Sequence, residues 1–208
     1  MSHLISIGVV YEDELSLRVI ESLARYCGFG IGAKDGPKRR SAILAQSLPY
    51  VVKLTEEQPW LVLIDLDYDV CAPSLLEVNL PQRPPFLIIR VAVREIESWV
   101  LADGKNLANF LGVAEKHIRT TPDDLEDAKR ALLNIALRSH RKKVVTLAAD
   151  TLSGRRDYRQ FSSLLADFIE TDWDPFKAVL RSPSLDRCIR NISSVLPILE
   201  EEGRTVEP

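Results

Sequence analysis

Cysteine is scarce in this sequence, and its placement argues against a cysteine-built structural site. Cys27, Cys71 and Cys188 are odd in number, lie far apart and form no Cys-x-x-Cys pair. Disulfide frameworks and zinc sites need paired or closely spaced cysteines, so neither is expected. The three residues are typical of reduced cytoplasmic thiols.

Long apolar runs are also absent. No stretch approaches the roughly 18 apolar residues that are needed to cross a bilayer. The first residues, MSHLISIGVVYEDE, include an apolar run but no basic leader and no small-residue cleavage site. We therefore expect a cytoplasmic protein that has no membrane partner.

A basic excess is missing, and so are two common catalytic motifs. The formal net charge of −3 argues against a generally basic coat for nucleic acid. A local basic surface remains open, because electrostatic steering depends on the distribution of charge rather than its total. The patterns GxxxxGK[ST] and GxSxG do not occur, so neither a phosphate-binding loop nor a serine acyl-transfer site is expected.

Three apolar runs are present and predict the strands of a sheet. The chain has 208 residues, of which 46% are hydrophobic and 27% charged, as in an ordinary globular protein with a real core. Residues 4–11, 60–64 and 86–93 are the expected strands. The run 60–64 is continuously apolar, which is typical of a strand buried on both faces in a parallel sheet. We predict an α/β fold with a mainly parallel sheet flanked by helices over residues 1–112, and a C-terminal helical annex over 113–208.

Other segments are predicted from helical spacing and from glycine and proline. Residues 30–40 form a polar segment with four basic side chains, interpreted as a flexible loop or as a basic lip over an acidic site. Residues 41–58 are expected to be helical, with a kink or break at Pro49. Further helices are expected over residues 122–138, 158–170, 174–180 and 184–200.

Acidic residues follow each of the three predicted strands. Glu12 follows the first strand, Asp65 and Asp67 the second, and Glu97 the third. The carboxyl ends of parallel strands meet at one edge of the sheet, where open α/β folds place their ligands. Hard oxygen ligands suit Mg²⁺ or Mn²⁺. We therefore predict a site in which Glu12, Asp65 and Asp67 bind the metal and all four residues serve catalysis.

Each of these side chains also has a simpler explanation. Glu12 could be an acidic residue at a helix N-terminus, and Glu97 could merely pair with Arg94. Asp69 lies deeper in the following loop, and no motif supports it. Arg155 and Arg156 are candidates for binding a nucleic-acid backbone, although a solvated loop would contain the same residues.

The strand-end motifs carry a resemblance to a known fold. A glutamate after the first strand and Asp-x-Asp after a later one resemble the TOPRIM fold of primases, topoisomerases and OLD-type nucleases; the second residue there is usually glycine, but here it is Asp13. The segments VAVREIESWVLAD, YRQFSSLLADFI and WDPFKAVLRSPSLDRCIRNI resemble an uncharacterised bacterial TOPRIM-like family. The resemblance implies a Mg²⁺-dependent nuclease acting on nucleic acid, in a defence system beside an ATPase partner. Members of that family carry Lys-x-Gly before the tyrosine, near the position of Arg155 and Arg156.

Two other interpretations remain open. The chain could be a non-catalytic binding or regulatory subunit whose acidic residues serve only metal or partner binding. It also resembles a response-regulator receiver over IGVVYEDELSLRVIESLARYCGFG and LVLIDLD, with Asp65 as phosphoacceptor. The MPGxDG-like segment and the later Thr/Ser and Lys strand ends of receivers are missing. The sequence does not distinguish DNA from RNA, and it leaves the oligomeric state open.

Overall fold

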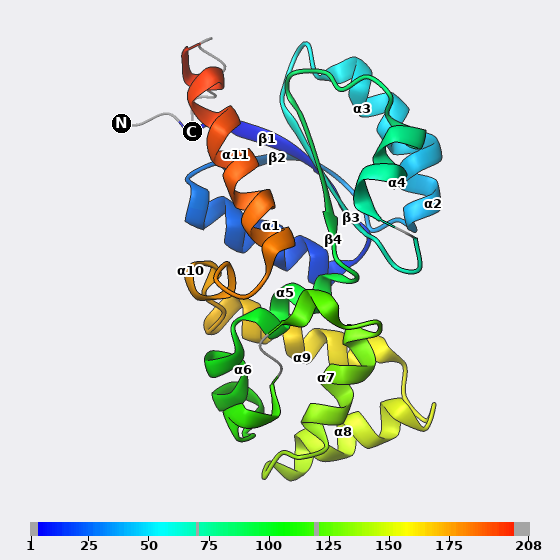
Figure 1. The fold of residues 1–208 in the computed structure, drawn as a ribbon, viewed down its shortest axis with the longest axis vertical. Coiled ribbons are helices and arrows are strands. Elements are labelled where there is room, and N and C mark those ends of the chain that lie inside the picture. The colour runs from blue at the N-terminus through cyan, green and yellow to red at the C-terminus, as the bar shows by residue number, and fades with distance from the viewer. Residues whose placement is uncertain (1–3, 70, 119–120, 202–208) are drawn as a thin grey trace. The chain divides into compact units, whose positions relative to one another are not determined.

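The chain forms two compact units (Figure 1). The computed structural model describes residues 4–69, 71–118 and 121–201. The first unit comprises the described residues up to Val91 together with those from Asp186 onward, and the second comprises those from Ala92 to Leu185. The sequence placed the boundary after Gly112 instead. The first unit is therefore built from two separate stretches of chain.

A four-stranded parallel sheet forms the centre of the first unit, which confirms the predicted fold class. The strand order is β2-β1-β3-β4, and β1 pairs in parallel with both β2 and β3. All six residues of β3 are buried, as expected for a strand covered on both faces. The strands are β1 (Ser6–Val10), β2 (Gly30–Asp35), β3 (Trp60–Asp65) and β4 (Leu87–Ala92).

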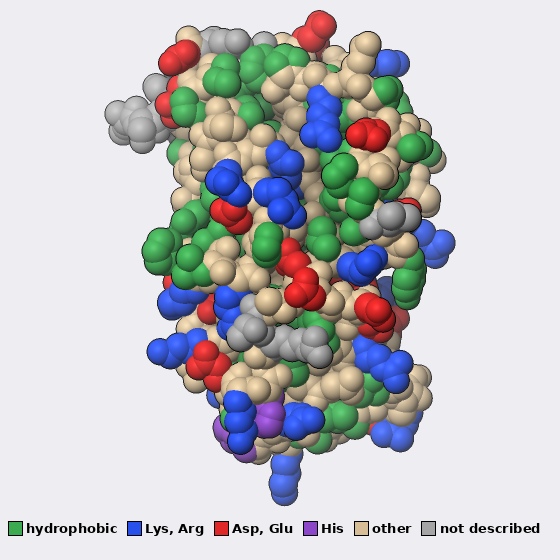
Figure 2. Space-filling model, in the orientation of Figure 1, with side chains coloured by type: hydrophobic (Ala, Val, Ile, Leu, Met, Phe, Trp, Pro, Cys, Tyr) green, Lys and Arg blue, Asp and Glu red, His purple; other side chains and the backbone are tan. Residues whose placement is uncertain are grey.

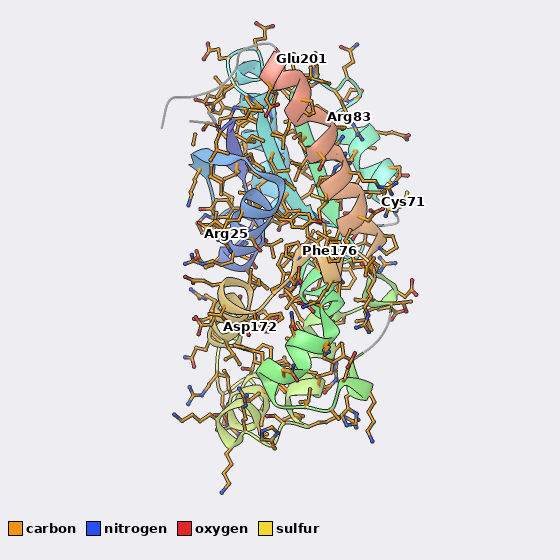
Figure 3. All side chains as sticks on the ribbon, turned by 90° about the vertical axis from the view of Figure 1, so that its left-hand side faces the viewer. Arg25, Cys71, Arg83, Asp172, Phe176 and Glu201 are labelled. Carbon is orange, nitrogen blue, oxygen red and sulfur yellow. The ribbon has the colours of Figure 1, made fainter. Side chains whose placement is uncertain are left out.

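The strand order determines where the helices of this unit lie. Right-handed crossovers place the helix between β1 and β2 on one face, and those between β2 and β3 and between β3 and β4 on the other. The last helix lies on the same face as the first, where the thiol of Cys27 is hydrogen-bonded to Ser193 (Figures 1 and 3). The helices are α1 (Glu14–Cys27), α2 (Arg40–Ala42), α3 (Leu48–Leu54), α4 (Ala72–Asn79) and α11 (Pro183–Glu201).

One close backbone approach fixes the pairing of the two central strands. Gly8 lies opposite Trp60 in the β1–β3 register, and its N–H donates to the Pro59 carbonyl at 2.9 Å. A Cβ atom at Gly8 would lie 2.6 Å from the Trp60 ring. The indole therefore packs on the bare backbone of β1, and no larger residue fits there.

The segment of residues 30–40 is not a loop throughout, contrary to one of the two interpretations. Its first six residues form β2, an edge strand that pairs only with β1 and is largely exposed. Edge strands of this kind need no continuous apolar run, because only part of their surface faces the core. The basic residues Lys38, Arg39 and Arg40 then lead into a helical segment.

The helical segment after β2 changes its winding before a proline. A π-helical turn (Ile43–Ser47) connects α2 to α3, and Pro49 lies in the first turn of α3. Proline has no N–H, and its ring would clash with the carbonyl four residues earlier, so a wider turn fits here. The predicted break at Pro49 thus takes the form of a π turn, and the helix ends at Leu54 rather than at 58.

The second unit is helical. Its core holds Trp99, whose indole N–H donates to the Ser184 hydroxyl at 2.7 Å, and Trp173, whose indole N–H donates to the Trp99 carbonyl at 3.1 Å. The predicted helix over residues 122–138 is a 3₁₀ turn (Pro122–Asp124) followed by a shorter helix, and α8 was not predicted. The helices are α5 (Ile96–Ala102), α6 (Gly104–Leu111), α7 (Ala128–Ala136), α8 (Lys142–Leu152), α9 (Tyr158–Thr171) and α10 (Pro175–Ala178), with a second 3₁₀ turn (Glu115–His117). Among the residues described in either unit, no helix has the length and apolar character to cross a membrane.

Candidate functional site

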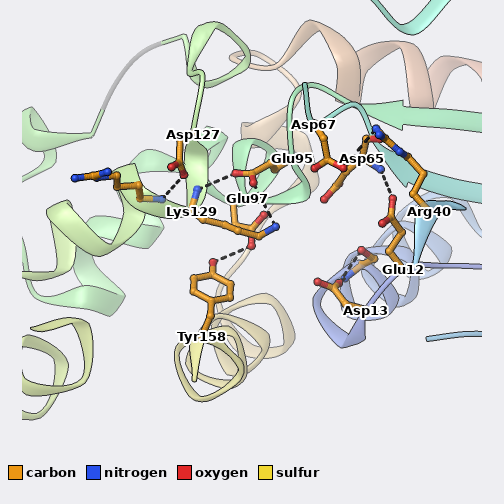
Figure 4. Close-up of polar contacts among 12 residues, drawn as sticks. Glu12, Asp13, Arg40, Asp65, Asp67, Glu95, Glu97, Asp127, Lys129 and Tyr158 are labelled. Atoms are coloured by element: carbon orange, nitrogen blue, oxygen red, sulfur yellow. Dashed lines mark hydrogen bonds and ion pairs between the residues drawn. The ribbon is translucent and has the colours of Figure 1, made fainter. Parts of the chain in front are cut away.

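The predicted acidic residues of the first unit lie at the point where the sheet changes direction. From β1 the chain moves to β2 on one side and later returns as β3 on the other, so the carboxyl ends of β1 and β3 flank a topological switch point. Ligands of open α/β sheets bind at such points. Glu12 follows β1, while Asp65 ends β3 and Asp67 follows it, so the structure brings these three residues to one edge (Figure 4).

Glu12 is held directly against the end of β3. Its Oε1 accepts a hydrogen bond from the backbone N–H of Asp65 at 2.7 Å. Burial, the largest influence, raises the pKa of the Glu12 carboxyl, and the negative charge of Asp67 adds to that rise. The next residue, Asp13, instead caps α1, because its Oδ1 accepts from the N–H of Ser16 at 2.8 Å. Asp13, and not Glu12, is thus the residue that caps α1.

A single guanidinium, that of Arg40, contacts both the backbone and the carboxylates of the loop that follows β3. The Nη1 of Arg40 donates to the carbonyls of Asp65 and Leu66 at 3.0 and 2.6 Å. The same nitrogen lies 3.4 Å from Asp67 Oδ2 and 2.9 Å from Asp69 Oδ2. Asp67 has a φ of 50°, a left-handed conformation that aspartate tolerates better than most residues. Arg40 therefore holds a tight, acidic turn in place.

An open cleft of about 550 Å³ lies at this edge of the sheet. Asp65 itself is buried behind it, with 7% of its surface exposed. Charges of both signs face the cleft, so a ligand would meet acidic groups beside basic ones. The lining includes Glu12, Asp67 and Asp69, the basic Arg39 and Arg40, and the apolar Leu44 and Leu75. Two of the four basic residues of the segment 30–40, Arg39 and Arg40, thus lie beside the acidic groups of the cleft.

The oxygen donors of the cleft suit a divalent cation in their chemistry. Carboxylates are the ligands that Mg²⁺ prefers, and a cation beside Glu12 would favour the charged form that burial disfavours. In residues 4–69, 71–118 and 121–201, however, no three His, Cys, Asp or Glu side chains are grouped so that they could hold a metal ion. The cation that contacts Asp67 here is the Arg40 guanidinium. A metal that bound Asp67 through Oδ2 would therefore compete with Arg40 for that oxygen.

Glu97, the fourth predicted residue, belongs to the second unit. It lies in the first turn of α5, is fully buried, and its Oε1 accepts a hydrogen bond from the Tyr158 hydroxyl at 2.8 Å (Figure 4). Nearby, the carboxylate of Glu95 accepts from the backbone N–H of Lys129 at 3.0 Å and pairs with its ammonium at 3.3 Å. The second unit thus holds one fully buried carboxylate, Glu97, and a partly exposed one, Glu95, each with its own partner.

The predicted backbone-binding arginines share one carboxylate. Arg155 Nε donates to Asp150 Oδ1 at 2.9 Å, and Arg156 Nε donates to Oδ2 of the same residue at 3.1 Å. Arg156 also donates to Gln160 at 2.7 Å. These hydrogen bonds lower the pKa of the Asp150 carboxyl. The pair thus keeps one uncompensated positive charge, which weakens it as a phosphate clamp.

No sequence motif indicates the contacts that Arg40 makes with the loop after β3. Its distance from the aspartates along the chain hides the contact, and the only signal was the cluster of basic residues before the helix. Asp69 was set aside for lack of a motif, yet it makes the closest ion pair to Arg40. A sequence pattern cannot show which carboxylates a distant guanidinium reaches.

No protein-family model, curated protein or solved structure matches this chain. The TOPRIM-like resemblance therefore stays a prediction from the sequence motifs.

Proposed function

We propose that the chain is a Mg²⁺- or Mn²⁺-dependent nuclease that hydrolyses phosphodiester bonds at the acidic cleft. The observation that carries the proposal is the convergence of Glu12 with Asp65 and Asp67 at the switch point of a parallel sheet. Ligand sites of open α/β sheets lie at this position, and the cleft is open to solvent.

The residues of the cleft have distinct parts in this proposal. Glu12, Asp65 and Asp67 would hold the cation. The bound cation would neutralise phosphate charge and make a bound water more acidic. Arg39 is exposed, faces the cleft and has no ion-pair partner in the part of the chain that the structure describes, so it is suited to hold a phosphate oxygen. Arg40 orders the turn that positions Asp67.

The test is cleavage of nucleic acid by purified protein. Plasmid DNA and a structured RNA are incubated separately with the protein and Mg²⁺, Mn²⁺ or EDTA, and the products are separated on gels. Glu12→Gln and Asp67→Asn remove single negative charges at nearly constant shape. Glu57→Gln is the matched control, because Glu57 is exposed in the same unit and does not line the cleft. We expect metal-dependent cleavage that both cleft variants lose and the control keeps.

One observation favours a second candidate, a non-catalytic binding or regulatory subunit. Asp67 and Asp69 are already paired with Arg40, as in a cluster that serves structure rather than metal chemistry. Thermal unfolding separates the two. A metal-dependent rise in melting temperature without cleavage of DNA or RNA would favour the binding subunit. If the metal produced no cleavage and no rise in melting temperature, both metal-based proposals would be overturned. An ATPase partner and a role of Glu97 beside the cleft stay predictions.

The receiver interpretation has less support. Receivers use an acidic pair after the first strand, but here Asp13 is engaged as the cap of α1. Labelling of Asp65 by acetyl phosphate would nevertheless favour it over the nuclease.

A further inference from the structure

Arg83, Arg90 and Arg187 of the first unit lie near one another, and none has a carboxylate partner among the residues that the structure describes. Arg83 precedes β4, Arg90 lies on β4, and Arg187 lies on α11. Among the residues that the structure describes, none of the three has a hydrogen bond or an ion pair from its guanidinium. Three other arginines of this unit are compensated: Arg18 pairs with Glu14 and Glu21, Arg40 with Asp67 and Asp69, and Arg190 with Asp186.

The guanidinium groups of Arg83 and Arg187 are each close enough to that of Arg90 to repel it. Burial most strongly, and then the charges of Arg83 and Arg187, lower the pKa of Arg90, whereas no carboxylate contributes to its shift. Arg83 lies next to the ribbon of α11 in Figure 3, and Figure 2 shows basic side chains gathered on the face where α11 runs. The cluster thus concentrates positive charge on one face of the unit.

Arg90 also leaves a buried donor unused. Its Nε is inaccessible to solvent and has no hydrogen-bond partner within residues 4–69, 71–118 and 121–201. Buried donors are nearly always satisfied in native proteins, so an unused one needs an explanation. An anion that accepts hydrogen bonds beside Arg90 would offset the repulsion among the three positive charges and restrain the guanidinium.

We propose that Arg83, Arg90 and Arg187 form a binding site for the phosphate groups of a nucleic-acid backbone. A guanidinium group binds phosphate through two parallel hydrogen bonds. Phosphate oxygens therefore suit a cluster of three guanidinium groups better than an anion with a single acceptor atom would. Arg83 and Arg187 are exposed while Arg90 is partly buried, so the site is a surface rather than an enclosed pocket. An open surface suits a polymer more than a small anion. The choice of nucleic acid rests on the proposed function, but binding does not require cleavage.

The experiment measures binding in EDTA, where metal-dependent cleavage cannot contribute. The full chain is titrated into a labelled 20-nucleotide single strand and into a duplex of the same sequence, and fluorescence anisotropy is followed at several salt concentrations. The test protein is the double variant Arg83→Gln/Arg187→Gln, which changes two exposed residues. The control Arg25→Gln/Arg138→Gln removes the same charge from two other exposed arginines.

We expect the wild-type chain to bind both the single strand and the duplex. The slope of the logarithm of the binding constant against the logarithm of the salt concentration should be smaller in magnitude for the test variant, by about 1.4 for a single strand or about 1.8 for a duplex. Each of the two lost phosphate contacts contributes roughly 0.7 or 0.9 to that slope. The control should match the wild type. Equal slopes for the test and control variants would overturn the site. If the chain bound neither the single strand nor the duplex, while inorganic phosphate raised its melting temperature, the nucleic-acid assignment would be overturned. Binding without cleavage in Mg²⁺ would support this site while counting against the nuclease.

Discussion

Replacing Arg40 with glutamine should loosen the turn after β3 and destabilise the first unit. The side chain donates two hydrogen bonds to the carbonyls of Asp65 and Leu66 and lies beside two carboxylates. Hydrogen bonds that involve a charged group contribute about 1.5–3 kcal/mol each, and partly exposed ion pairs about 1 kcal/mol or less. The Leu66 carbonyl also accepts from the Asp69 N–H at 3.1 Å, so it keeps one partner. We expect a loss of about 2–4 kcal/mol.

This loss can be measured by thermal and urea unfolding. For a chain of this size, 1 kcal/mol corresponds to about 2–4 °C in melting temperature, so the variant should melt roughly 5–15 °C lower. Arg40→Lys should recover only part of the difference, because an ammonium cannot reproduce the geometry of the guanidinium. Arg25→Gln, on the exposed last turn of α1, is the control.

The same variant tests whether a metal and Arg40 compete for Asp67. Without the guanidinium, Mn²⁺ should raise the melting temperature of Arg40→Gln by more than it raises that of the wild type, since a ligand stabilises the state that it binds. The reasoning about the turn would be refuted if Arg40→Gln lost less than about 1 kcal/mol, or no more than the Arg25 control. An equal Mn²⁺ effect on both chains would refute the competition.

Three further predictions follow from other contacts. Burial raises the pKa of Glu12 above its unfolded value, so its ionised form costs stability at neutral pH and that cost disappears as the pH falls through the raised pKa. Glu12→Gln should therefore melt higher than the wild type at pH 7 in EDTA, and the difference should shrink toward pH 4; a difference independent of pH would contradict this. Burial raises the pKa of Cys188 to about 12, whereas a hydrogen bond from Ser74 lowers that of Cys71. A thiol reagent at pH 8 should label Cys71 first and Cys188 only on unfolding, as peptide mapping would show, and early labelling of Cys188 would argue against its burial. Tyr158→Phe removes a donor from the buried Glu97 carboxylate and should cost about 1.5–3 kcal/mol in urea unfolding; an unchanged midpoint would mean that the hydrogen bond contributes nothing.

The strands that could be predicted are those whose residues mostly face the core. The runs at 60–64 and 86–93 correspond to β3 and β4, because β3 is buried throughout and β4 is buried except at Arg90, which leaves a nearly continuous apolar signal. The sequence GIGAKD gave no such signal, yet it forms β2 because an exposed edge strand depends on backbone pairing with β1. The helix α8 was not predicted from the sequence.

The candidate site was predictable only in part for a similar reason. Glu12, Asp65 and Asp67 could be predicted to meet because parallel strands end at a common edge. The ion pairs of Arg40 with the aspartates, and the sharing of Asp150 by Arg155 and Arg156, depend on side-chain reach. A sequence pattern fixes the direction of a strand but not the partner of a flexible side chain.

The return of α11 to the first unit has a consequence for synthesis of the chain. The residues of α11 that are buried in this unit, such as Ile192 and Leu199, emerge from the ribosome about a hundred residues after β4. Until then, the apolar side chains that they will cover on α1 and the sheet remain accessible to solvent and to other chains. The helical second unit consists of continuous sequence, so it can begin folding while the first is still incomplete. The sheet, although it comes first in the chain, is therefore expected to be finished last.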